Sequence, residues 1–79
     1  MGYPRPRPVH LAAKLLRIRQ ALNLSQSELV ERLGVEIDYN YISKYELNKN
    51  EPPLAVLLAY SRASGIPVAR IIDDDKEII

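Results

Sequence analysis

Apolar residues recur at helical intervals over five segments of this chain, and short polar or glycine- and proline-containing stretches separate the segments. In the first segment, from His10 to Leu22, the apolar side chains follow one another at intervals of four, three and four residues, which predicts one buried face of a helix. These side chains are Leu11, Leu15, Ile18 and Leu22. His10, Lys14, Arg17 and Gln20 lie off this face, so we expect them in solvent.

The second helix is predicted from residues at its two ends. Ser25 and Glu28 have the spacing of a capping box, in which the serine oxygen accepts one free amide of the helix start and the glutamate accepts another. The helix then begins at Gln26. Gly34 follows the last apolar residue, Leu33, and glycine favours the left-handed conformation that ends a helix. The pattern therefore predicts barely two turns of helix.

A third helix is predicted after Asp38, whose carboxylate can accept a hydrogen bond from a free amide at the helix start. Ile42 and Tyr45 share one side of this segment and are expected to face the core. The opposite side is polar, and it is free to contact a partner. It carries Tyr39, Asn40, Ser43 and Lys44.

Prolines and a glycine delimit the last two helices. Pro52 and Pro53 open the fourth helix, because the amide that proline lacks is not used in a first turn, and Gly65 closes it. Its expected inner residues are Leu54, Leu57, Leu58 and Ser61. The short fifth helix begins at Pro67 and has more apolar surface than it needs for docking. These surplus residues are Val68, Ile71 and Ile72. The five segments together predict an all-α fold.

Composition bounds the class of protein. Seventy-nine residues allow one domain, and 47% hydrophobic with 27% charged residues is ordinary for a globular chain. No apolar run approaches the roughly 20 residues of a membrane span, and no secretory signal is expected, so a cytoplasmic protein fits. The absence of cysteine excludes disulfides and thiolate chemistry. With one histidine and no phosphate-binding loop, we predict no catalytic residues, no cofactor and no metal.

The ends of the chain differ from its middle. Residues 1–9 alternate proline with arginine and predict a flexible arm, residues 10–72 hold the helices, and residues 73–79 form an exposed acidic tail. The arm is either untethered, or its Arg5 and Arg7 follow a phosphate backbone or enter a minor groove, as the N-terminal arms of some DNA-binding domains do. Residues 1–50 carry eight Lys/Arg against five Asp/Glu, whereas residues 51–79 carry three against five. This asymmetry is compatible with a DNA-facing first part.

A set of residues specific in type and spacing runs through the second and third helices. It comprises Ser25-Gln26, Leu29, Leu33-Gly34-Val35, Ile42-Ser43, Glu46 and Pro52. With these residues, the chain from about residue 11 to residue 72 resembles the helix-turn-helix of the phage repressor and Cro family, also called the Xre family. The resemblance implies a compact five-helix, lambda-repressor-like domain whose third helix enters the major groove of double-stranded DNA. The chain departs from the family by two extra turn residues, Glu36 and Ile37.

The resemblance also implies roles for individual residues. Tyr39, Asn40 and Lys44 align with base-contacting positions, although a rotated third helix would give base contact to Tyr39 or Tyr41 instead. The residues expected at the DNA backbone are Gln26, Ser27, Ser43 and Lys49, with Arg5 and Arg7 from the arm. Asn48 stands where the family commonly has glycine, and asparagine tolerates the left-handed conformation. Arg19 and Glu46 would form a structural ion pair. Val68, Ile71 and Ile72 would join two subunits.

Two hypotheses of function follow. In the first, the chain is a sequence-specific transcriptional regulator that binds an inverted-repeat operator as a homodimer. In the second, it is an antitoxin-type module that binds a toxin or another protein through the Pro-Arg arm and the isoleucine-rich tail. An enzyme is the weakest reading, since the usual nucleophile and base arrangements cannot be assembled from these residues.

Overall fold

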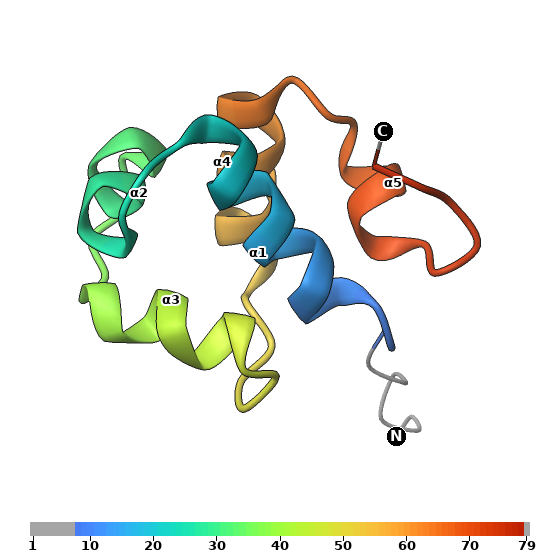
Figure 1. Ribbon diagram of the computed structural model, residues 1–79, viewed down its shortest axis with the longest axis horizontal. Helices are drawn as coiled ribbons and strands as arrows, with labels where there is room; N and C mark the ends of the chain where they lie inside the picture. The colour runs from blue at the N-terminus through green and yellow to red at the C-terminus, as the bar shows by residue number, and fades with distance from the viewer. Residues whose placement is uncertain (1–7, 79) are drawn as a thin grey trace.

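Five α-helices and the turns between them make up residues 8–78, which are the residues that the computed structural model describes (Figure 1). The helices are α1 (Leu11–Leu22), α2 (Gln26–Leu33), α3 (Tyr39–Glu46), α4 (Leu54–Ser64) and α5 (Val68–Ile72). No strand occurs within this range. The predicted all-α class is therefore confirmed. None of the helices in this range is both long and apolar enough to cross a membrane.

The helix ends follow the local signals of the sequence. At the start of α2, the Glu28 amide donates to Ser25 Oγ over 3.1 Å and the Ser25 amide donates to Glu28 Oε1 over 2.8 Å. At the start of α3, the Asn40 amide donates to Asp38 Oδ1 over 2.8 Å. Gly34 ends α2 in the left-handed conformation, with φ +68°. The predicted capping box, N-cap and glycine stop are all confirmed.

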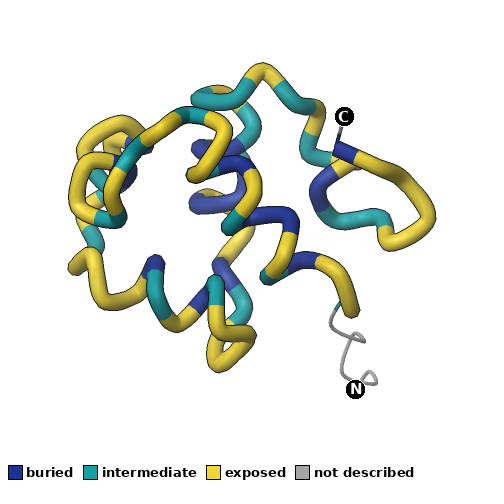
Figure 2. Tube along the Cα trace, in the orientation of Figure 1, coloured by how far each residue is buried: buried dark blue, intermediate teal, exposed yellow. Residues whose placement is uncertain are grey.

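Every helix contributes to a single core, which lies where α1 and α4 pack together and α2, α3 and α5 close around them (Figures 1 and 2). The largest fully buried side chains come from all five helices, namely Leu15, Ile18, Leu29, Ile42, Tyr60 and Ile71. A chain of this length buries only about 60% of its unfolded surface, so each short helix depends on contacts with the others.

The inner face of α4 differs from the prediction. Leu54 was expected inside, but 63% of it is exposed, and Leu58 is only half-buried. The buried side is formed by Val56, Leu57, Ala59 and Tyr60. The physical reason is that α4 is apolar nearly all round at its start, so periodicity cannot fix which side faces the core.

Two serines at the end of α4 close the turn into α5. Ser61 Oγ donates to the Ile66 carbonyl over 2.6 Å, and Ser64 Oγ donates to the Tyr60 carbonyl over 2.8 Å. Ser64 Oγ also accepts the Ile66 amide over 3.1 Å. Ser61 and Ser64 thereby join the last turn of α4 to the carbonyl and the amide of Ile66, which lie beyond the helix end. Ser61 contributes by hydrogen bonding instead of by the apolar packing that the sequence suggested.

The residues after α5 turn back onto the start of α1. Asp74 accepts the amides of Val9 and His10 over 2.8 and 2.9 Å. Lys14 Nζ donates to the Arg70 carbonyl over 2.9 Å and to the Asp73 carbonyl over 2.7 Å. We call Lys14, Asp74 and these two carbonyls the α1–α5 cluster. Lys14 was expected in solvent, and this prediction is wrong because only 6% of the residue is exposed. Its ammonium group is buried against the C-terminal carbonyls of α5, where a cation is favoured.

The apolar residues at the end of the chain are used inside it. Ile71 is fully buried in the core, Ile78 is buried beside it, and Val68 and Ile72 are half-buried against the same core. The tail was expected to lie in solvent, yet it returns to the core through Ile78. Most of the apolar surface that suggested a subunit interface at Val68, Ile71 and Ile72 is therefore buried within the domain itself. Ile71 in particular is unavailable to a partner in this conformation.

Candidate nucleic-acid interface

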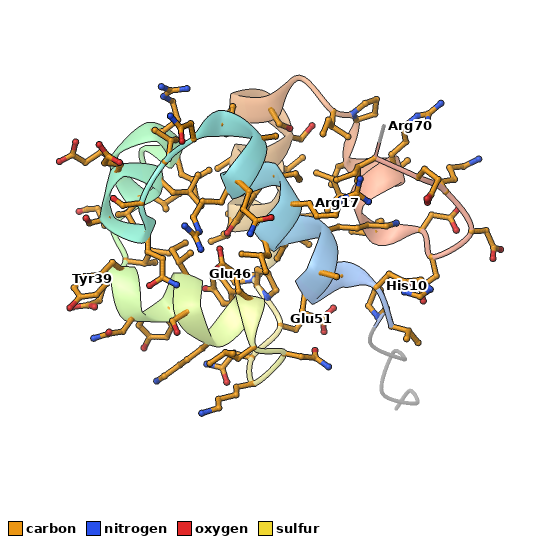
Figure 3. All side chains as sticks on the ribbon, in the orientation of Figure 1. His10, Arg17, Tyr39, Glu46, Glu51 and Arg70 are labelled. Carbon is orange, nitrogen blue, oxygen red and sulfur yellow. The ribbon has the colours of Figure 1, made fainter. Side chains whose placement is uncertain are left out.

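The outer side of α3 is an exposed surface with a polar and aromatic character. Tyr39 begins the helix with 52% of the residue exposed (Figure 3). Asn40 and Lys44 are also exposed, whereas Ser43 is half-buried. Ile42 and Tyr45 are buried on the other side, as expected. The helix therefore docks by one face and leaves the other open to a partner.

Tyr41 adds a contact with Lys44 on this outer surface that was not predicted from the sequence. The residue is 42% exposed, and Lys44 Nζ lies 5.1 Å from the centroid of its ring. The ring of Tyr45 lies 6.4 Å away from the ring of Tyr41, centroid to centroid, with the two planes tilted by 41°. The spacings of three and four residues between these side chains were the available signal, since such residues are neighbours on a helix.

A polar cluster fixes the other end of α3. Arg19 Nε donates to Glu46 Oε2 over 2.6 Å, and Arg19 Nη2 donates to Glu46 Oε1 over 3.0 Å. Gln26 Nε2 donates to the same Oε1 over 3.2 Å. We call Arg19, Gln26 and Glu46 the α1–α3 cluster. Arg19 also donates to the Leu24 carbonyl over 3.0 Å, so one guanidinium joins α1, the turn after it and α3.

The α1–α3 cluster is largely shielded from water. The side chain of Arg19 is 19% exposed and that of Glu46 is 6% exposed. The hydrogen bond to Glu46 raises the pKa of Arg19, an effect that partial burial opposes. Figure 3 shows Glu46 pointing inward from the end of α3, toward α1. Because the two partners come from helices far apart in sequence, the pair fixes how α3 is oriented on the core.

The start of α2 has a different donor set from the one expected. Gln26 is half-buried and its side-chain amide bonds to Glu46, so that amide is committed to the fold. Ser27 is exposed, with its Oγ 3.4 Å from Ser25 Oγ. The Glu28 amide is already taken by Ser25 Oγ, whereas the amides of Gln26 and Ser27 have no partner within the helix and point outward at its N-terminal end. These amides, together with the Ser27 hydroxyl, are the donors that a phosphate could meet here.

The two extra turn residues leave α3 packed against α2. Ile37 is half-buried against the core and Glu36 is exposed. Ile37 thereby covers apolar surface, and Asp38 directly after it caps α3. Glu36 and Ile37 thus lie in the turn between Gly34 and the start of α3.

The loop beyond α3 carries Lys49. Asn48 adopts φ +61°, which confirms the expected left-handed conformation. The next amide, that of Lys49, donates to the Lys44 carbonyl over 2.8 Å, and the Lys49 side chain is exposed. Arg5 and Arg7 lie outside the described residues.

A buried hydroxyl lies beneath α3. Tyr60 is fully buried, and its hydroxyl has no hydrogen-bond partner among the described residues. Burial raises the pKa of Tyr60, and the nearby charge of Glu46 adds to this rise. Nothing in the spacing of Tyr60 along the sequence marks it as a functional residue. Over residues 8–78 there is no group of three His, Asp or Glu side chains that could hold a metal ion.

Two helices joined by a short turn, the second of them exposed on one face and fixed at both ends, form a helix-turn-helix. The profile of the helix-turn-helix family matches residues 15–71, well over half of the chain. The chain belongs to this family, in its Cro/C1 or Xre-like branch, and its all-helical domain has the lambda-repressor-like fold. It is therefore a DNA-binding helix-turn-helix regulator. A comparison with the curated proteins gives no significant match.

Proposed function

We propose that the chain regulates transcription by binding an inverted-repeat operator as a homodimer, with α3 in the major groove. The observation that carries the proposal is the fixed orientation of α3. Asp38 caps its start, Glu46 ties its end to Arg19, and its outer face is exposed between these two points. Because both ends of α3 are anchored, its outer side chains keep one fixed orientation when the helix meets DNA.

Asn40 and Lys44 are the proposed base readers, with Tyr39 beside them at the helix start. Asn40 and Lys44 are both exposed and four residues apart, so they lie one above the other on one side of α3. An asparagine amide can bond adenine at N6 and N7, and a lysine can donate to guanine at O6 and N7. The Tyr39 ring and hydroxyl suit a thymine methyl group or a backbone oxygen.

Lys49, Ser27 and Ser43 are the proposed backbone contacts, and Arg5 and Arg7 would extend them. Lys49 and Ser27 are exposed, and Ser43 is half-buried on the outer side of α3. Contacts of this kind set the position of a protein on DNA and carry no sequence information by themselves.

Dimerisation is proposed from the geometry of DNA. A single α3 of eight residues spans only one half-site, and two copies related by a two-fold axis would meet successive major grooves about 34 Å apart. Val68 and Ile72 retain some exposed surface for such a contact, whereas Ile71 does not. The antitoxin alternative gains no support, because Ile78, which was to contact the toxin, is buried in the chain's own core.

The proposal is tested by selecting bound sequences from a random pool of double-stranded DNA. We expect enrichment of an inverted repeat with half-sites about one helical turn apart. On that operator, Asn40→Ala should weaken binding by about 1–3 kcal/mol and flatten discrimination at one base pair of each half-site. Lys49→Ala should weaken binding to all sequences alike and lower the slope of log affinity against log salt by about one for each subunit, which is about two for the homodimer.

The matched pair of variants makes the test specific. If Asn40→Ala behaves as Lys49→Ala does, with a uniform loss and an altered salt slope, α3 does not read bases through Asn40. A pool that yields no inverted repeat would argue against the dimeric operator, and co-purification of a second protein would then favour the protein-binding alternative.

A further inference from the structure

We infer that Tyr41 is a positioning residue, and that its ring holds the Lys44 ammonium group where it selects guanine at one base pair of each half-site. The inference rests on the proposed function, because it concerns how one of the proposed base readers acquires its specificity. The observation behind it is the juxtaposition of three side chains of α3, namely the buried Tyr45 and the exposed Tyr41 and Lys44.

The ring of Tyr41 packs against the ring of the buried Tyr45. Tyr45 is 4% exposed and belongs to the core, and its ring packs against that of Tyr41 at 6.4 Å. Tilted rings at this separation attract each other, because the positive edge of one faces the negative face of the other. Tyr41 is thereby braced on a buried residue while much of its ring remains in solvent. It forms a rigid surface beside a flexible lysine.

The Lys44 ammonium group lies on that surface. Its nitrogen is 5.1 Å from the ring centroid, within the distance at which a cation is attracted to the face of an aromatic ring. At an exposed site, this attraction favours the ring-bound position of a cation by about twofold to fivefold. A free lysine has four rotatable bonds and many positions for its charge. The ring thus concentrates the charge in one place before DNA arrives.

The position of the charge decides what Lys44 can distinguish. An ammonium group is a point charge without the planar fork of arginine, so it selects a base only if its position is fixed. In the major groove, guanine presents two acceptors, N7 and O6, whereas adenine presents one acceptor beside an amino donor. A mobile lysine is also drawn to phosphate oxygens, which carry no sequence information. Holding Lys44 over Tyr41 favours the guanine contact over the phosphate contact.

The first experiment examines the free protein and does not depend on DNA. A methylene group next to an ammonium over an aromatic face is shielded by the ring, so the Lys44 Cε proton resonances should lie upfield of those of the exposed Lys49. Tyr41→Phe should keep this shift, and Tyr41→Leu should abolish it. Wild-type Lys44 resonances at the same position as those of Lys49 would overturn the inference.

The second experiment measures relative affinity for the selected operator and for its single-base variants. Tyr41→Leu should reduce the preference for guanine over adenine at one position by about twofold to fivefold, with an unchanged salt slope because the Lys44 charge remains. Tyr41→Phe should keep the preference. A loss in Tyr41→Phe equal to that in Tyr41→Leu would overturn the inference, since it would show that the Tyr41 hydroxyl contacts the DNA.

A double substitution separates positioning from general damage to the helix. In a Lys44→Met background, where the guanine preference is already lost, Tyr41→Leu should cause no further change in base preference. A further change would mean that Tyr41 acts independently of Lys44. Circular dichroism and thermal unfolding of each variant establish that the domain is folded at the assay temperature. A wild-type protein with no operator preference would refute the proposed function, whereas a specific wild-type protein with an unaffected Tyr41→Leu variant would refute this inference alone.

Discussion

Two polar clusters hold α1 to the rest of the domain, one near each end of that helix, and they stabilise charge in different ways. In the α1–α3 cluster, the guanidinium of Arg19 is paired with the carboxylate of Glu46. In the α1–α5 cluster, the Lys14 ammonium bonds two backbone carbonyls, and the Asp74 carboxylate bonds two backbone amides. The first cluster pairs two formal charges, and the second pairs each charge with a helix terminus.

The two clusters also differ in what they position. The α1–α3 cluster fixes the end of α3, which is the proposed reading helix. The α1–α5 cluster lies on the other side of α1, toward α5 and the end of the described chain (Figure 1). We therefore expect damage to the first cluster to alter both stability and DNA binding. Damage to the second should alter stability and leave base preference unchanged.

The largest effect is expected from Glu46→Ala. This substitution leaves Arg19 largely buried without its carboxylate partner, so the free energy of unfolding should fall by about 3 kcal/mol. Operator affinity should fall as well, because the end of α3 loses its attachment to α1. Urea unfolding and operator binding measure the two effects.

A double-mutant cycle provides the control for this prediction. Arg19→Ala combined with Glu46→Ala should destabilise the domain less than the sum of the two single substitutions, because the double variant strands no charge. Additive losses would show that the pair behaves like an exposed ion pair worth less than about 1 kcal/mol.

A smaller effect is expected from Lys14→Met, which keeps the apolar stem and removes the ammonium group. The carbonyls of Arg70 and Asp73 would lose a charged donor, and the free energy of unfolding should fall by about 1–2 kcal/mol. Base preference on the operator should not change. Arg17→Met on the same helix is the matched control, since Arg17 is exposed and its loss should matter by less than about 0.5 kcal/mol. Equal losses in the two variants would mean that burial of Lys14 contributes nothing.

The Arg19–Glu46 pair of the α1–α3 cluster and the helix boundaries were the features that the sequence could predict, whereas the contact of Gln26 with Glu46 was not predicted. Short-range rules determine the ends of α2 and α3, because Ser25, Gly34 and Asp38 act on amides or carbonyls within a few residues of themselves. The resemblance to a known family suggested the pairing of Arg19 with Glu46, and the two side chains are in contact.

The α1–α5 cluster could not be predicted because its partners are backbone groups. A lysine that bonds carbonyls more than fifty residues away leaves no complementary side chain in the sequence. The polar periodicity of the first helix predicted that Lys14 lies in solvent. In sequence, a lysine whose aliphatic stem carries the ammonium group to a distant helix end cannot be distinguished from an exposed lysine. The same limit explains α4, where a nearly continuous apolar run leaves its inner face undetermined.

The smallest effect is expected from Asp74→Asn, and it depends on pH. The amides of His10 and Val9 hold the pKa of Asp74 below its usual value. A carboxylate whose pKa is lower in the folded than in the unfolded state stabilises the fold above its unfolded pKa, near 4, and loses this effect as the pH falls through the folded pKa. At pH 7 the Asp74→Asn variant should therefore be slightly less stable than the wild type, because asparagine is uncharged.

The comparison of urea midpoints between pH 7 and pH 2 tests this directly. The wild-type and Asp74→Asn curves should converge at the acid end, where Asp74 is protonated and resembles an amide. Both curves should still decline below about pH 4, because the capping box with Ser25 lowers the pKa of Glu28 in both proteins. Asp75→Asn removes a neighbouring exposed carboxylate without touching the start of α1, so its curve should run parallel to that of the wild type. If the urea midpoints of Asp74→Asn and Asp75→Asn coincide across the whole pH range, the hydrogen bonds from the amides at the start of α1 to Asp74 do not stabilise the fold.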